Sequence, residues 1–152
     1  MRLSFLIYEN GPLVTGPIVS QRRLFHALRN HGHDIQVLCL FHESSPLHDH
    51  FHENSFSTSR FPAGKYTHET LPWILEANRD FEPDVFIPDW IALGGFAARW
   101  IRDAGIPTIG GLRSDDSYFW AMMRTFAQED SDPWALSGVF CVSRELESKL
   151  TK

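Results

Sequence analysis

The sequence predicts an α/β domain with a mostly parallel sheet and helices on both faces, a doubly wound arrangement of three layers. Two observations lead to this prediction. Short apolar runs alternate with longer amphipathic segments, as in parallel strands joined by helical crossovers. The short runs are apolar at nearly every position, which indicates strands buried on both faces. A length of 152 residues fits one such domain, spanning residues 1–152.

The strands are predicted first, from these runs. They lie at Leu3–Tyr8, Ile35–Phe41, Val85–Pro88, Pro107–Leu112 and Val139–Val142, with a weaker candidate at Phe56–Phe61. Apolar residues repeat about every 3.6 positions between them, which predicts helices. These helices cover Pro17–Asn30, 71–81, Ile91–Ala104 and 119–127, and a last one follows Ser143. Two stretches are predicted to be irregular, Phe41–Gly64 and Gln128–Ser137.

Composition excludes several classes of protein. The net charge is −5 and the densest basic cluster is Arg22–Arg23, so no nucleic-acid partner is expected. Cys39 and Cys141 sit inside apolar runs, where a free thiol behaves as a small hydrophobe. No apolar run approaches the roughly 18 residues of a membrane span, and the first run is too short for a signal peptide. We therefore expect a cytoplasmic protein.

Ligands of parallel sheets bind beyond the carboxyl ends of the strands, so the polar residues after each strand are the candidates for a site. Thr15 and Gly16 precede the first helix, whose free N–H groups attract anions. A loop with glycines needed only for its turns explains this segment equally well. A nicotinamide or flavin fingerprint is absent, because there is no GxGxxG and no acidic residue ends the second strand.

Further candidates follow the later strands. Asp89 follows the third main strand, and Arg113 and Asp116 follow the fourth. Asp116 either caps the next helix or accepts a hydroxyl hydrogen bond from a polyol, and Arg113 pairs with an anion or with a neighbouring aspartate. Ser143 is well placed as a helix cap. No arrangement of residues identifies a catalytic group.

Four histidines between His42 and His52 invite a metal site. No cysteine or ordered scaffold supports such a site, so we predict a mobile, solvated loop and no metal.

Five segments in the expected order resemble the N-terminal domain of GT-B glycosyltransferases of the group 1, or family 4, type. The family's glycine loop, helix core, GHxVxV, KPDVVHxHD, GIPxVxxxH and DxVIxVS patterns are approximated in turn. The corresponding segments are Gly16–Leu28, Gly32–Val37, Glu82–Asp89, Gly105–Gly111 and Gly138–Ser143. This sequence departs from the family where Arg113 and Ser114 stand near the family's usual histidine, and where Thr-Gly-Pro replaces Gly-Gly.

The resemblance implies a Rossmann-like domain on the acceptor side of an enzyme of carbohydrate biosynthesis. A nucleoside-diphosphate sugar would be the donor substrate, with no cofactor, and transfer would be metal-independent and retaining. Thr15 and Gly16 would approach the donor phosphates, Asp89, Arg113 and Asp116 would face a sugar, lipid or glycan acceptor, and Ser143 would lie near the domain cleft. Peripheral membrane association of the full enzyme is also implied.

The resemblance further implies a partner. In the family a C-terminal Rossmann-like domain carries the basic residues and E-x7-E motif that hold the donor, and the segment after Ser143 supplies no such motif. The chain is therefore expected to be incomplete and nearly inactive alone. Two alternatives remain open: another nucleotide- or cofactor-binding α/β protein, and a non-enzymatic interaction module.

Overall fold

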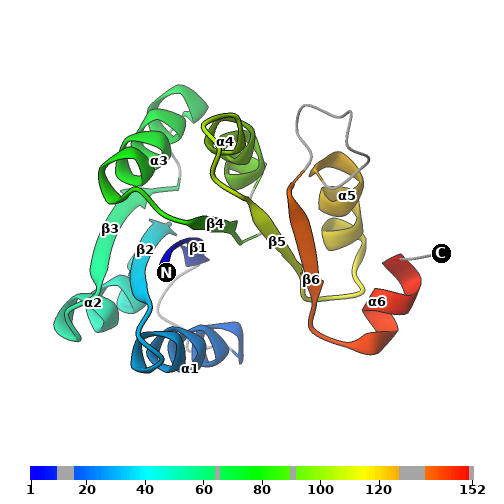
Figure 1. The fold of residues 1–152 in the computed structure, drawn as a ribbon, viewed down its shortest axis with the longest axis horizontal. Coiled ribbons are helices and arrows are strands. Elements are labelled where there is room, and N and C mark those ends of the chain that lie inside the picture. The colour runs from blue at the N-terminus through cyan, green and yellow to red at the C-terminus, as the bar shows by residue number, and fades with distance from the viewer. Residues whose placement is uncertain (10–15, 64–65, 90–91, 127–135, 151–152) are drawn as a thin grey trace.

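The computed structural model describes residues 1–9, 16–63, 66–89, 92–126 and 136–150. Strands and helices alternate along these residues (Figure 1). The strands are β1 (Arg2–Glu9), β2 (Asp34–Phe41), β3 (Ser57–Pro62), β4 (Val85–Pro88), β5 (Ile109–Leu112) and β6 (Gly138–Cys141). The helices are α1 (Gly16–Asn30), α2 (Pro46–Glu53), α3 (Thr67–Phe81), α4 (Ala92–Asp103), α5 (Ser117–Phe126) and α6 (Arg144–Leu150).

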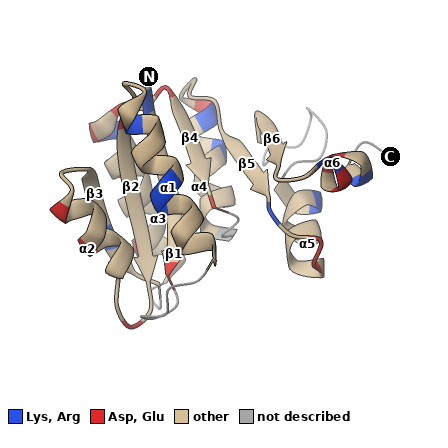
Figure 2. Cartoon of the chain, turned by 90° about the horizontal axis from the view of Figure 1, so that it is seen from below, with Lys and Arg blue, Asp and Glu red and all other residues tan. Residues whose placement is uncertain are grey.

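All strand pairs in the described residues are parallel. One sheet has the order β3-β2-β1-β4, and β5 pairs with β6. A bridge between Phe86 and Thr108 joins β4 to β5, and the Phe86 N–H donates to the Pro107 carbonyl at 2.9 Å. Figures 1 and 2 show β5 and β6 beside β4, so the strands run in the order β3-β2-β1-β4-β5-β6. This order confirms the predicted doubly wound fold.

Helices cover both faces of the sheet, because alternate residues of each strand point to opposite sides. Phe5 of β1 packs with Phe25 of α1 and Phe51 of α2 on one face. Leu6 packs with Ile74 of α3 and Ala97 of α4 on the other. In Figure 1 α1 and α2 accordingly lie below the sheet, and α3 and α4 lie above it. These are the three predicted layers.

The prediction of an irregular stretch over Phe41–Gly64 is wrong for most of its length. The structure has helix α2 at Pro46–Glu53 and strand β3 at Ser57–Pro62, the latter close to the weak candidate. Leu47 and Phe51, four residues apart on α2, are both fully buried. Two apolar positions among histidines and acids gave too little periodicity to reveal this helix. The other irregular stretch lies almost entirely outside the described residues.

Helix α4 approaches the sheet closely at Gly94. A Cβ at this position would lie 2.7 Å from Cβ of Pro88 and 3.0 Å from Cδ2 of Leu6. The proline ring is rigid, so it could not move aside easily. Because glycine has no side chain, helix α4 can pack directly against the end of β4 at this position.

We expect Gly94→Ala to destabilise the chain by about 1–2 kcal/mol in denaturant unfolding, because overpacking costs roughly 1–3 kcal/mol. At an exposed helix position the same change would stabilise by about 1 kcal/mol. Gly138→Ala is the matched control, since a Cβ there meets no atom within 4 Å. A stabilising Gly94→Ala would show that α4 does not pack this closely.

Candidate functional site

A cleft of about 510 Å³ lies at the carboxyl ends of β1, β4 and β5. Its walls are formed by Tyr8, Pro17, Asp89, Arg113, Ser114, Tyr118 and Phe119. Chain connections leave β1 and β4 in opposite directions along the sheet, and such a switch point opens a crevice between them. Residues far apart in the sequence therefore meet at this cleft.

Asp89 is held in the cleft by three elements. Its backbone N–H donates to the Leu6 carbonyl of β1 at 2.8 Å. Its Oδ2 accepts a hydrogen bond from Nε2 of Gln21, a buried residue of α1, at 3.0 Å. Its Oδ1 lies 3.3 Å from Nε of Arg113, which follows β5. The sequence suggested a neighbouring aspartate, Asp115 or Asp116, as the partner of Arg113, whereas in the structure the partner is Asp89.

The Asp89–Arg113 pair is largely shielded from water, with side chains 23% and 21% exposed. Burial raises the pKa of Asp89, and Arg113 and the hydrogen bond from Gln21 only partly oppose this rise. The buried Nε of Arg113 is close enough for an ion pair but makes no hydrogen bond with any described residue. Both side chains of the pair line the cleft.

Two tyrosines line the same cleft. Tyr8 of β1 is 39% exposed and Tyr118 of α5 is 52% exposed. Burial raises the pKa of the Tyr118 phenol, and the negative charges of Asp89 and Asp116 raise it further. Tyr118 is therefore a neutral phenol near neutral pH. The cleft combines aromatic rings with a carboxylate acceptor and guanidinium donors.

Asp116 and Ser143 have capping roles in the structure. Asp116 Oδ1 accepts hydrogen bonds from the backbone N–H groups of Tyr118 and Phe119, at 3.0 and 3.1 Å. Ser143 Oγ accepts one from the Leu146 N–H at 3.2 Å. Both were weighed as helix caps from the sequence, and neither lines the cleft. Ser143 follows β6 at the same edge of the parallel sheet.

The predicted phosphate loop is described only in part. Thr15 lies outside the described residues, and Gly16 is the exposed first residue of α1. Pro17, next to it, lines the cleft. The N-terminal end of α1 therefore faces the same space as Asp89 and Arg113, which is where an anion would meet the positive end of the helix.

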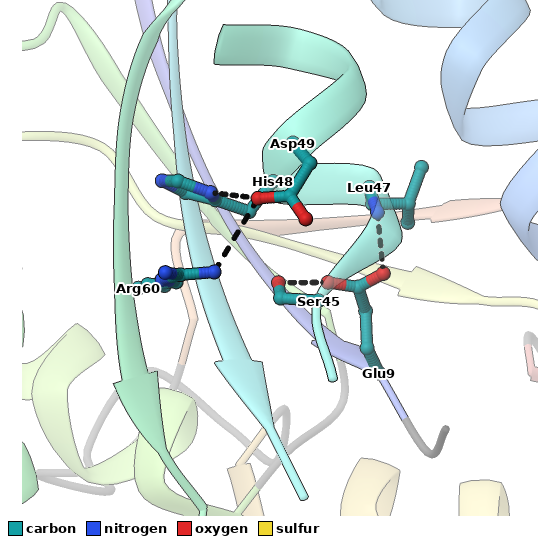
Figure 3. Close-up of polar contacts among 6 residues, drawn as sticks. All are labelled: Glu9, Ser45, Leu47, His48, Asp49 and Arg60. Atoms are coloured by element: carbon teal, nitrogen blue, oxygen red, sulfur yellow. Dashed lines mark hydrogen bonds and ion pairs between the residues drawn. The ribbon is translucent and has the colours of Figure 1, made fainter. Parts of the chain in front are cut away.

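A buried carboxylate at the carboxyl end of β1 holds the start of α2 in place (Figure 3). Glu9, at the end of β1, is 1% exposed. It accepts hydrogen bonds from the Ser45 hydroxyl and, at 2.7 Å, from the backbone N–H of Leu47. Glu9 thereby satisfies one backbone N–H group at the start of α2, a favourable place for a negative charge. Asp49, one turn further, contacts His48 and Arg60.

The prediction of a mobile histidine loop is wrong, because His48, His50 and His52 lie on α2. Nε2 of His50 is 3.1 Å from Nε2 of His26 on α1, and burial lowers the pKa of His50. Within the described residues there is no group of three or more His, Cys, Asp or Glu side chains arranged to hold a metal ion.

Tyr8, Gln21 and Tyr118 were not identified from the sequence. Tyr8 belongs to an apolar run that predicts a buried strand. Tyr118 belongs to a helix whose aromatic residues are predicted to pack in the core. Gln21 lies one turn into α1, four residues after Pro17. A polar residue on the buried, sheet-facing side of α1 was the one feature of the sequence that could have indicated a role for Gln21.

Comparison with known proteins identifies the family. A family model described as a glycosyl transferase 4-like domain matches residues 15–149. The chain belongs to this family. No curated protein sequence matches it significantly.

Solved structures show where this glycosyl transferase 4-like chain fits in a larger fold. It is similar to UDP-GlcNAc 2-epimerase from Neisseria meningitidis bound to UDP-GlcNAc, with a TM-score of 0.63 and 11% identity. It is also similar to a UGT transferase from Siraitia grosvenorii in complex with UDP, with a TM-score of 0.52 and 13% identity.

The chain spans less than half of either protein. The alignments cover 99% and 86% of this chain, but 42% and 32% of those chains. Fold and family together identify a Rossmann-like domain of the GT-B N-terminal type, as the resemblance implied. In the described residues, no helix is both long and apolar enough to cross a membrane.

The raised pKa of Asp89 predicts a pH dependence of stability. The folded chain binds a proton at Asp89 at higher pH than the unfolded chain, whose aspartates have the ordinary pKa of about 3.8. The contribution of Asp89 to the free energy of unfolding therefore rises as the pH falls through its raised pKa. Between about pH 7 and pH 4, wild type should gain stability relative to Asp89→Asn in denaturant unfolding.

Asp116→Asn is the matched control, because asparagine also caps helices. Hydrogen bonds from Ser114 and from the N–H groups of Phe119 and Tyr118 lower the pKa of Asp116. The contribution of Asp116 to the free energy of unfolding is therefore present above the ordinary pKa of an aspartate and is lost only below about pH 4. If Asp89→Asn followed this second pattern, Asp89 would not be buried as the structure shows.

Proposed function

We propose that this chain is the acceptor-side domain of a glycosyltransferase, which transfers a sugar from a nucleoside-diphosphate sugar to an acceptor bound in the cleft. The observation that carries the proposal is the Asp89–Arg113 pair, which shares a cleft with Tyr8 and Tyr118 at the switch point of the sheet.

The chemistry of the cleft suits a sugar. A sugar ring presents apolar C–H groups on its faces and hydroxyl groups around its edge. The tyrosine rings offer aromatic surface for the faces. Asp89 accepts hydrogen bonds from hydroxyls and Arg113 donates to them, and hydrogen bonds to charged groups are stronger than those between neutral groups. Site preorganisation favours this role, because Gln21 and Leu6 fix the position of Asp89 before any ligand binds.

The donor would meet the cleft from the side of α1. The N-terminal end of this helix, at Gly16, would stabilise negative charge on the diphosphate leaving group. The two solved structures support a donor of this class, because they contain UDP-GlcNAc and UDP. The groups that bind the nucleotide would belong to a second domain. Both similar solved structures are long enough to contain one, because this chain covers less than half of each.

The far edge of the sheet offers a contact surface for that domain. A groove beside β6 is lined by Val139, Phe140, Cys141, Val142, Ser143, Arg144, Glu147 and Leu150. Three of these apolar side chains are exposed, Val142 the most at 58%. Exposed apolar surface of this kind is typical of a face that another domain covers.

Binding of simple glycosides tests the proposal. We would titrate ¹⁵N-labelled chain with methyl glycosides of glucose, galactose, mannose and N-acetylglucosamine and follow the amide signals by NMR. At least one glycoside should shift the signals of Tyr8, Asp89, Arg113 and Tyr118. Asp89→Asn should weaken that binding about tenfold or more, because a hydrogen bond to a charged group contributes about 1.5–3 kcal/mol.

Asp103→Asn is the control for this experiment, since Asp103 ends α4 and pairs with Arg99 away from the cleft. It should leave glycoside binding unchanged. UDP should bind the chain far more weakly than it binds the chain together with the proposed donor-binding domain. Shifts confined to residues outside the cleft, or tight UDP binding by the chain alone, would contradict the proposed division of roles.

A further inference from the structure

A pair of histidines joins the two helices that cover one face of the sheet. His26 lies on α1 and His50 lies on α2, 24 residues apart in the sequence. Their Nε2 atoms are 3.1 Å apart, and neither residue lines the cleft at Asp89. We propose that this pair binds a divalent transition-metal ion of the Ni²⁺, Cu²⁺ and Zn²⁺ class, which would link α1 to α2.

The separation of the two nitrogens fits neighbouring ligands of one metal ion. Bonds from imidazole nitrogen to zinc are about 2.0–2.1 Å long, so nitrogens 3.1 Å apart would subtend an angle of about 95–102° at the ion. This angle lies between those of octahedral and tetrahedral coordination. With both rings neutral and protonated at Nδ1, each Nε2 offers a lone pair to the ion, and water would complete the coordination.

Packing holds both rings in place before any ion binds. The ring of His26 contacts that of Phe56 edge-on, with centroids 5.1 Å apart, and the ring of His50 contacts that of Phe51 at 5.2 Å. Both phenylalanines are buried, whereas both histidines are only half-buried. The two imidazoles are therefore supported from the core and partly accessible to solvent, which suits a preorganised site.

The nearby charges favour the metal-binding form of His50. Burial lowers the pKa of His50, the positive charge of Arg22 and the neighbouring His26 lower it further, and the negative charge of Glu53 opposes them. His50 is therefore neutral near neutral pH, as a metal ligand must be. Arg22 repels a bound cation and Glu53 attracts it, so the two residues act in opposite directions on affinity.

A second pair of histidines on α2 is less suitable. The rings of His48 and His52 are stacked nearly parallel, at 18°, with centroids 5.9 Å apart. Lone pairs in two parallel ring planes do not converge on one ion. The rings of His26 and His50 are instead inclined at 77°. Spacing in the sequence could not reveal this pair, because its members lie on different helices.

Titration of the ¹⁵N-labelled chain with metal ions tests the inference by NMR. Cu²⁺ should broaden the amide signals around His26 and His50, and Zn²⁺ should shift them. Mg²⁺ should do neither, because it prefers oxygen ligands to imidazole. Zn²⁺ should also raise the midpoint of denaturant unfolding, since an ion that binds the folded chain stabilises it. Binding should weaken as the pH falls below 6.5, the ordinary pKa of a histidine.

Single substitutions locate the site. His26→Asn and His50→Asn should each weaken Zn²⁺ binding about tenfold or more, because one of two protein ligands is lost. His52→Asn, on the same helix, is the matched control and should leave the affinity unchanged. Arg22→Gln should tighten binding and Glu53→Gln should weaken it. Amide spectra of the metal-free variants check that each one folds.

Three results would overturn the inference. They are the absence of Zn²⁺ binding at micromolar concentrations, unchanged affinity in both His26→Asn and His50→Asn, and Cu²⁺ broadening centred on His31, His33, His48 or His52. None of them bears on the proposed sugar site, because the histidine pair shares no residue with the cleft.

Discussion

The site depends on how β5 is attached to β4. In the described residues one bridge joins these strands, between Phe86 and Thr108, with a hydrogen bond of 2.9 Å from the Phe86 N–H to the Pro107 carbonyl. Thr108 is fully buried, and its carbonyl accepts a 2.8 Å hydrogen bond from the Ser137 N–H at the start of β6. This junction brings the residue after β5 opposite the residue after β4. Without this junction, nothing would hold Arg113 within ion-pair distance of Asp89.

Two carboxyl groups at the carboxyl ends of the strands differ in their surroundings, Glu9 being fully buried and Asp89 partly buried. Glu9 is stabilised locally, because it accepts hydrogen bonds at the start of α2 and so supports the fold. Asp89 is held by Gln21 and Arg113, yet burial still raises its pKa. A carboxyl group in a cleft whose pKa is raised by burial is a candidate for function, because perturbed pKa values gather at such sites. The structure thus distinguishes an acid that contacts the start of α2 from one that lines the cleft, which the sequence could not do.

Much of the fold could be predicted from the sequence, because strands buried on both faces leave nearly continuous apolar runs such as the one at Ile35–Phe41. Helix α2 could not, since only Leu47 and Phe51 mark its buried side. Asp89 and Arg113 could be proposed because each directly follows a strand. Their pairing depends on the order of the strands in space, and the contribution of Gln21 depends on the rotation of α1 against the sheet. Neither is encoded in local spacing, so the sequence indicated the members of the site but not their contacts.

The attachment of β5 to β4 can be measured directly by amide hydrogen exchange at Phe86. If the junction holds as described, this amide should exchange as slowly as those of the central strand β2, such as Leu38, because its hydrogen bond to Pro107 would open only with the core. Exchange at the rate of an unprotected amide, with Leu38 still protected, would contradict the account. In that case β5 and Arg113 would not be held opposite Asp89.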